Sequence, residues 1–163
     1  MKRQLIAIDT EYNSNENLGM INKVFCIAAS DESNNKFVKW FDGQNDPNIL
    51  DEISSFFNIE NPIYVCFAFE KAERKALLHL GVNLHKYDFI DSYLIEKFLT
   101  CSVERTEKVK SLSLVETTKR YKLTPRDCEQ KELMRQYCIN DETASHEQDI
   151  MNYCFDDVKD LIS

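Results

Sequence analysis

Long apolar runs are missing from this sequence, and none approaches the ~20 residues that a helix needs to cross a membrane. The first residues, 1–4, lead directly into a predicted strand and carry no secretory cleavage pattern. We therefore expect a cytoplasmic, intracellular protein with no membrane among its partners.

Closely spaced cysteine pairs are also missing. The six cysteines include no C-x-x-C pair, the spacing that would suggest a zinc site. They are scattered along the chain, and several lie inside apolar runs, as Cys26 and Cys66 do. We interpret them as reduced thiols in a cytosolic protein. A disulfide framework is the alternative interpretation.

The sequence also lacks an excess of positive charge, since its net charge is −8 at pH 7. Proteins that hold duplex DNA by charge alone are usually basic, so the balance argues against that class. A cluster of carboxylates that binds metal ions contributes negative charge of its own. The acidic balance therefore remains compatible with a site that contacts phosphate through metal ions.

The bulk composition is that of one globular domain. The chain has 163 residues, of which 43% are hydrophobic and 29% charged. That length is enough to bury a substantial core. No internal repeat or low-complexity segment divides the chain, so we expect a single domain over residues 1–163.

The most informative stretch is residues 5–12, LIAIDTEY, in which an apolar run precedes two carboxylates one residue apart. Such a run is typical of a strand buried on both faces. Side chains alternate along a strand, so Asp9 and Glu11 point the same way about 7 Å apart. Their repulsion would be relieved by Mg²⁺ or Mn²⁺, which prefer oxygen ligands. The alternative is that both are ordinary solvated residues where a strand meets a loop.

The pattern of apolar and turn residues predicts five strands interleaved with helices. Strands one to three are expected to form an antiparallel meander with a hairpin turn at residues 31–35. The predicted elements are strands at 5–8, 23–29, 36–41, 63–69 and 87–91, and helices at 46–57, 70–80, 93–99, 111–123, 126–137 and 142 onward, with a loop at 100–110.

This order of elements is that of the ribonuclease H-like α/β fold. It predicts a central mixed five-stranded sheet of order 3-2-1-4-5, flanked by helices. In that fold the first strand lies centrally. The carboxylates of the first strand would then form the floor of a cleft.

Tyr153 and Asp157 are four residues apart, so they project from the same face of the predicted last helix. Together with Asp9 and Glu11, and an acidic residue on the helix after the fourth strand, this Y-x-x-x-D pair resembles the DEDDy branch of the DnaQ-like 3′–5′ exonucleases. The resemblance is closest to the proofreading domain of phage-type family A DNA polymerases. The sister branch would place a histidine five residues before the last aspartate, where this sequence has Asn152.

The second motif departs from the family pattern. When the family's conserved leucine is aligned with Leu77, Glu73 takes the place of the usual aspartate and Ala72 that of the usual aromatic residue. Glu70, one turn earlier, is the rival ligand. For both glutamates the alternative is a solvated helix face beside Lys71 and its basic neighbours.

The resemblance implies a catalytic site with two Mg²⁺ or Mn²⁺ ions about 4 Å apart. Asp9 would bridge both ions, Glu11 and Asp157 would complete the site that activates water, and Glu73 would support the other ion. Tyr153 would orient the attacking water, because a phenol with a pKa of ~10 is a poor base. The alternative for Tyr153 is a core tyrosine.

The activity implied by the resemblance is metal-dependent 3′–5′ exonuclease action, a hydrolase activity used for proofreading in DNA replication. The substrate would be the 3′ end of single-stranded or frayed DNA, and the products nucleoside monophosphates. The chain begins close to its first strand and stops soon after Asp157. We expect either a compact viral or phage enzyme or a domain excised from a polymerase, with the polymerase domain as partner in the parent chain.

Two other functions stay open at this point. One is a catalytically impaired ribonuclease H-like module that binds nucleic acid or protein. The other is an exoribonuclease, since no residue in the sequence is identified as reading the 2′-hydroxyl.

Overall fold

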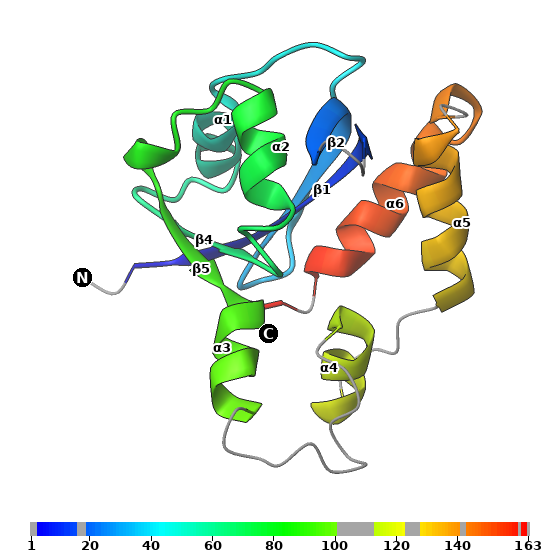
Figure 1. Ribbon diagram of the computed structural model, residues 1–163. Helices are drawn as coiled ribbons and strands as arrows, with labels where there is room; N and C mark the ends of the chain where they lie inside the picture. Colours follow the sequence, from blue (N-terminus) through cyan, green and yellow to red (C-terminus); the bar gives the residue numbers. More distant parts are fainter. Residues whose placement is uncertain are drawn as a thin grey trace.

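A five-stranded sheet of order β3-β2-β1-β4-β5 forms the centre of the molecule (Figure 1). The computed structural model describes residues 3–15, 19–100, 113–122, 128–140, 143–159 and 161–162. The strands are β1 (Leu5–Asn15), β2 (Met20–Asp31), β3 (Lys36–Trp40), β4 (Ile63–Cys66) and β5 (Asp88–Asp91). β1, β2 and β3 pair antiparallel, whereas β4 pairs parallel with β1 and β5. The predicted ribonuclease H-like sheet is confirmed.

The hairpin between β2 and β3 is held by one aspartate. The Asp31 carboxylate accepts hydrogen bonds from the backbone N–H groups of Ser33, at 3.0 Å, and Asn35, at 2.8 Å. Between them Asn34 has a φ of 59°, a left-handed conformation that asparagine tolerates. This turn sets the register of the predicted meander.

Helices cover both faces of the sheet, and alternate residues of β1 supply both cores (Figure 1). Ile6 and Ile8 pack on the side of α1 and α2, whereas Ala7 packs on the side of α6. The helices are α1 (Ile49–Phe56), α2 (Glu73–His79), α3 (Ser92–Thr100), α4 (Leu114–Arg120), α5 (Cys128–Ile139) and α6 (Glu147–Val158), with single 3₁₀ turns at Leu84–Lys86 and Thr143–Ser145.

β1 is longer than its apolar run predicts. It continues to Asn15 because it stays paired with β2 across a register shift between Glu11 and Tyr12. Its pairing with β4, in contrast, covers only Leu5–Ala7. Asp9 and Glu11 therefore lie in a strand that is paired on one side and open on the other.

The prediction of a strand over 63–69 and a helix over 70–80 was wrong at the junction. β4 ends at Cys66, the chain turns through Ala68 with a φ of 66°, and α2 begins at Glu73. The Asp91 carboxylate stabilises this turn by accepting the N–H of Ala68 at 3.0 Å. The same oxygen accepts the N–H of Tyr93, also at 3.0 Å, and so caps α3.

The chain after α3 also differs from the prediction. The final helix, expected from residue 142, begins at Glu147 after a 3₁₀ turn. Of the predicted loop over 100–110, residue 100 ends α3 and residues 101–110 lie outside the described residues. So do residues 111, 112 and 123 of the predicted helix over 111–123 and residues 126 and 127 of the next. In the described part of the chain, no helix has both the length and the apolar character needed to cross a membrane.

Free thiols are buried at Cys26, Cys66, Cys138 and Cys154. The interpretation of the cysteines as reduced thiols is confirmed for these four. Cys101 lies outside the described residues.

Candidate active site

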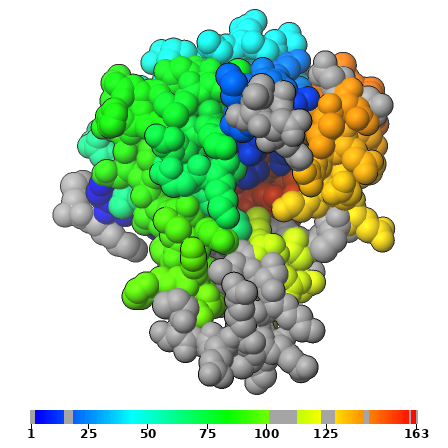
Figure 2. Space-filling model, viewed as in Figure 1, coloured from blue at the N-terminus to red at the C-terminus, as the bar shows by residue number. Residues whose placement is uncertain are grey.

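A cleft of about 480 Å³ opens where β1 diverges from β4. Its lining comes from β1, the turn after β4, the first residues of α2 and α4, and the facing sides of α5 and α6. Figure 2 shows the hollow beside the orange and yellow α5, with blue β1 and red α6 at its floor. The cleft brings together all five predicted site residues: Asp9, Glu11, Glu73, Tyr153 and Asp157.

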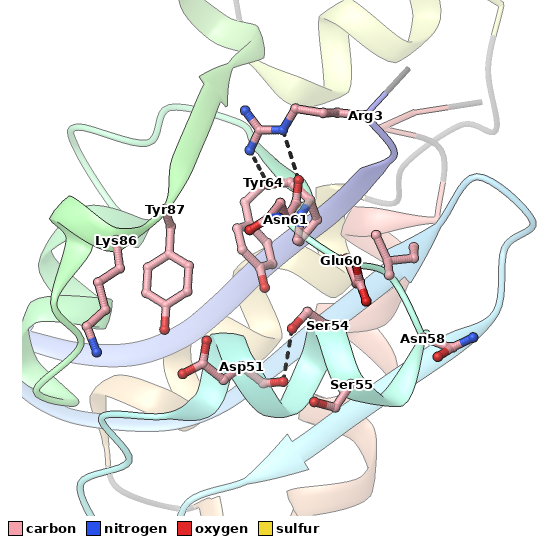
Figure 3. A pocket seen from close by; sticks show the side chains of 12 residues that line it. Arg3, Asp51, Ser54, Ser55, Asn58, Glu60, Asn61, Tyr64, Lys86 and Tyr87 are labelled. Atoms are coloured by element: carbon pink, nitrogen blue, oxygen red, sulfur yellow. Dashed lines mark hydrogen bonds between the residues drawn. The ribbon is translucent and has the colours of Figure 1, made fainter. Parts of the chain in front are cut away.

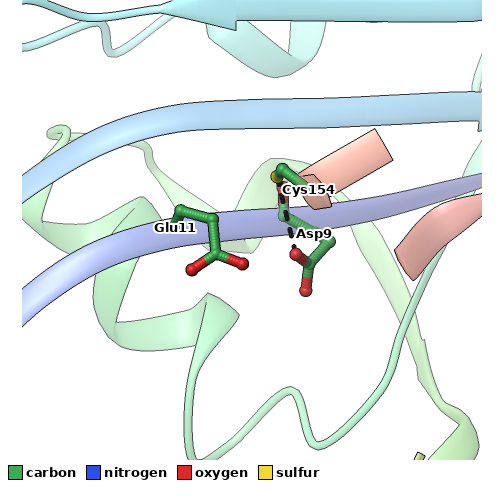
Figure 4. Close-up of side chains that lie close together, drawn as sticks. All are labelled: Asp9, Glu11 and Cys154. Carbon is green, nitrogen blue, oxygen red and sulfur yellow. Dashed lines mark hydrogen bonds between the residues drawn. The ribbon is translucent and has the colours of Figure 1, made fainter. Parts of the chain in front are cut away.

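The two β1 carboxylates lie close together over the end of α6. One oxygen of each and the Sγ atom of Cys154 all lie within 4.8 Å of one another (Figure 4). Burial, followed by the charge of Asp157, raises the pKa of Asp9 to about 7. Burial and then the charge of Asp9 raise the pKa of Glu11 well above its usual value. Both shifts show how strongly this site disfavours uncompensated negative charge.

Glu73 joins the cluster from the first turn of α2, and its side chain is only 2% exposed. Burial and the charge of Asp9 raise its pKa well above the usual value. A hydrogen bond between the two raises the pKa of Glu73 and lowers that of Asp9, so Glu73 donates it. The Oε2 atom of Glu73 is buried and finds no hydrogen-bond partner among the described residues.

Glu70 is placed differently from Glu73. Because α2 begins at Glu73, Glu70 belongs to the preceding turn, where it is exposed and 3.6 Å from the Arg74 Nε atom. The structure thus brings Glu73 to the cleft and leaves Glu70 on the surface. The alternative interpretation, a solvated surface position, therefore applies to Glu70 and not to Glu73.

α6 contributes Tyr153 and Asp157 from one face, and both are about nine-tenths buried. Tyr153 packs in the core between α6 and the sheet, and it also lines the cleft. Burial, the charge of Asp157 and a hydrogen bond to that carboxylate raise the pKa of Tyr153. Its hydroxyl therefore remains protonated and donates to Asp157.

Two cationic residues of the cleft were missed by the sequence reasoning. Lys131 and Arg135, four residues apart on α5, line the wall facing the carboxylates. The charge of Lys131 lowers the pKa values of Asp9 and Glu11. Their spacing in a charged segment was visible, but the position of α5 depends on Asn13, whose Nδ2 donates to the Cys138 carbonyl at 2.9 Å.

The donor set of the cleft fits divalent cations. Four carboxylates converge from β1, α2 and α6, and one buried carboxylate oxygen has no partner among the residues described. Mg²⁺ and Mn²⁺ take such oxygen ligands and would offset the repulsion that raises the carboxylate pKa values.

A second cavity, of about 500 Å³, lies at the other end of the sheet, where β4 begins (Figure 3). Its polar groups bind one another. The Arg3 guanidinium donates to the carbonyls of Asn61, at 2.9 Å, and Pro62, at 3.0 Å, and the Tyr64 hydroxyl donates to the carbonyl of Leu50. None of the five predicted site residues lines this cavity.

The sheet order and its helical covering are those of the ribonuclease H-like α/β fold. No protein-family model and no curated protein matches the sequence. Solved structures do match the fold, and the likeness is to the fold alone because the identities are low.

A family B DNA polymerase from the hyperthermophilic archaeon Pyrobaculum calidifontis matches with a TM-score of 0.63 and 15% identity, over 99% of this chain and 24% of that chain. E. coli exonuclease I in complex with a dA16 oligonucleotide matches with a TM-score of 0.51 and 13% identity, over 77% of this chain and 37% of that chain. An ExoI/SSB-Ct complex matches with a TM-score of 0.53 and 11% identity, over 96% of this chain and 43% of that chain. The chain therefore spans less than half of each of these chains.

Proposed function

We propose that the protein is a metal-dependent 3′–5′ exonuclease that releases nucleoside monophosphates from the 3′ ends of single-stranded or frayed DNA. The observation that carries this proposal is the meeting of Asp9, Glu11, Glu73 and Asp157, from three separate elements, in one cleft. Packing of a core does not require four acids in one place, because each raises the cost of ionising its neighbours.

Two Mg²⁺ or Mn²⁺ ions are the cofactors of this proposal. Asp9 would contact both ions, Glu11 and Asp157 would hold one, and Glu73 would hold the other. When bound, such a pair supplies an activated water, stabilises charge on the phosphate and assists the leaving 3′ oxygen. Tyr153, protonated beside Asp157, orients the water and does not take its proton.

The positive wall of the cleft supports a phosphate-bearing substrate. Lys131 and Arg135 face the carboxylates, so a strand that enters meets cations on α5 before it reaches the acidic floor. Phe67 also lines the cleft, and we propose that a base of the substrate stacks on its ring. The likeness to exonuclease I, solved with a dA16 oligonucleotide, supports single-stranded DNA as the substrate class.

A proofreading role in DNA replication is part of the proposal. Residues 1–163 would act as one exonuclease domain, either free-standing or joined to a polymerase domain in a longer chain. The likeness to a family B DNA polymerase, of which this chain covers 24%, supports the association with a polymerase. The closer kinship with family A remains a sequence-based prediction.

The test is a 5′-labelled single-stranded DNA oligonucleotide incubated with the protein and Mg²⁺ or Mn²⁺. We expect a ladder that shortens from the 3′ end, that stops when EDTA is added and that is absent with Asp9→Ala. Binding of the oligonucleotide without degradation at any protein concentration would instead identify a binding module. A matched RNA oligonucleotide, degraded faster than the DNA, would identify an exoribonuclease.

A further inference from the structure

Cys154 brings a sulfur atom to the acidic cluster from α6, next to Tyr153 in sequence. Its Sγ atom lies 3.4 Å from the Asp9 carbonyl oxygen and 3.5 Å from Asp9 Oδ2, to which the thiol donates. In the close view a dashed line joins the sulfur to the Asp9 carboxylate, and the carboxylates of Asp9 and Glu11 project from the same side of β1 (Figure 4). Cys154 is itself fully buried in the core cluster beside α6, so its thiol reaches the Asp9 carboxylate from the core side of the acidic cluster.

We propose that Asp9, Glu11 and Cys154 form a mixed oxygen and sulfur site for a thiophilic divalent cation such as Zn²⁺, distinct in ligand set from the all-oxygen sites for Mg²⁺ or Mn²⁺. Thiolate ligands select zinc over magnesium, whereas carboxylates alone favour the harder ions. Three protein ligands and one open position are a usual zinc arrangement.

The geometry needs little adjustment to take the ion. The three ligand atoms lie within 4.8 Å of one another. Zinc bonds of about 2.0–2.3 Å at tetrahedral angles hold ligand atoms about 3.5 Å apart, so a closure of about 1 Å is sufficient. Rotation of the two carboxylates supplies such a movement without shifting the backbone. Asp9 and Glu11 both line the cleft, which gives the ion its route in.

A second feature points to a cation at this place. The Oε2 atom of Glu73, in a side chain that is 2% exposed, has no hydrogen-bond partner within the described part of the chain. Glu73 lines the same cleft and shares a hydrogen bond with Asp9. A buried carboxylate oxygen without a donor is costly unless a positive charge lies near it. An ion bound by Asp9 would supply that charge.

Binding converts the thiol into a thiolate, and its proton passes to solvent buffer as the S–Zn bond forms. No oxidant or reductant takes part. If the proposed nuclease function holds, zinc at this site would displace Asp9 and Glu11 from their roles toward Mg²⁺ and inhibit hydrolysis. That consequence rests on the proposed function, whereas the binding itself does not.

The experiment uses Co²⁺ as a spectroscopic substitute for Zn²⁺ on the full chain, in a Cys101→Ser/Cys128→Ser background. Thiolate coordination to Co²⁺ gives a charge-transfer absorption band in the near ultraviolet, which carboxylate coordination does not. We expect the band with Cys154 present and its loss in Cys154→Ser and in Cys154→Ala. We expect the Kd for Zn²⁺, measured by competition with Co²⁺, to rise at least about tenfold in both variants, since losing even an outer-shell partner costs about 10–100-fold.

Cys138→Ser is the matched control, because Cys138 lines the same cleft but lies outside the cluster. It should keep both the band and the Zn²⁺ affinity. Thermal unfolding of each variant checks that it is folded, and the alanine variant avoids a new buried hydroxyl. Absence of the band with Cys154 present, or its persistence in either Cys154 variant, would overturn the inference. Neither readout requires nuclease activity, so the inference and the proposed function can fail separately.

Discussion

At the scale of single residues, the contrast between Glu73 and Glu70 is the sharpest. Glu73 is buried and hydrogen-bonded to Asp9, whereas Glu70 is exposed and lies beside Arg74. We expect Glu73→Gln to lower the metal-dependent kcat by about 10–100-fold or more, because it removes a charged ligand. Glu70→Gln should stay within about twofold of the wild type, as surface changes usually do. Rates of 3′-end shortening at saturating Mg²⁺ measure both, and the reverse ranking would show that the motif alignment is wrong.

Tyr153 combines a ring packed in the core with a hydroxyl that donates to Asp157. Tyr153→Phe keeps the packing beside α6 and removes only the hydroxyl that donates to Asp157. We expect kcat to fall by about 10–100-fold with an unchanged Tm, as for other groups that position a reactant. Tyr137→Phe is the control, because Tyr137 stacks on His146 at 3.7 Å and does not line the cleft. A Tyr153→Phe enzyme as active as the wild type would leave Tyr153 as a core residue only.

At the scale of elements, α5 gives the cleft its positive wall. Lys131→Ala removes the charge that lowers the pKa values of Asp9 and Glu11 and that faces an entering phosphate. We expect kcat/KM to fall about tenfold, the equivalent of one charge-assisted contact, and the loss to shrink at high salt. Lys97→Ala, at an exposed position of α3, should change kcat/KM little. An equal loss from both variants would indicate a general charge effect and not a local one.

Local patterns predicted the elements that carry most of the site. The apolar run before Asp9 and the four-residue spacing of Tyr153 and Asp157 were sufficient, because a strand or helix fixes where its own residues point. The start of α2 was not predictable from its helical composition. It depends on Asp91, distant in sequence, which holds the turn at Ala68. The cationic wall was missed for the same reason, since α5 is docked by Asn13 of β1.

At the scale of the whole molecule, the buried acidic cluster lowers the stability of the folded state when its carboxylates are ionised and no cation is bound. The pKa of Asp9 is raised from its usual value of 3.8 to about 7 in the folded protein, so in EDTA the stability falls as the pH rises from about 4 to about 7 and stays low above that range. Below its unfolded pKa this penalty is absent. We expect Asp9→Asn to increase the free energy of unfolding by up to about 4 kcal/mol at pH 8 in EDTA, the equivalent of the raised pKa, and to change it little at pH 4.

Divalent cations should make the wild type more stable than Asp9→Asn, the reverse of the order expected in EDTA. We expect Mg²⁺ or Mn²⁺ to raise the Tm of the wild type by binding its folded state, whereas Asp9→Asn, which lacks the proposed shared ligand, should respond little. Thermal unfolding in EDTA and in Mn²⁺, at both pH values, gives the full comparison. A wild type whose Tm does not respond to either ion would contradict the metal site altogether.

The early end of the β1–β4 pairing has a wider consequence, because the cleft is made by backbone divergence and not by the acids that line it. Neutralising the carboxylates leaves that opening, the α5 cations and Phe67 in place. Loss of hydrolysis and loss of DNA binding are therefore separable. A variant without catalytic activity should therefore still bind the end of a DNA strand. We expect Asp157→Asn to bind free 3′ ends without hydrolysing them.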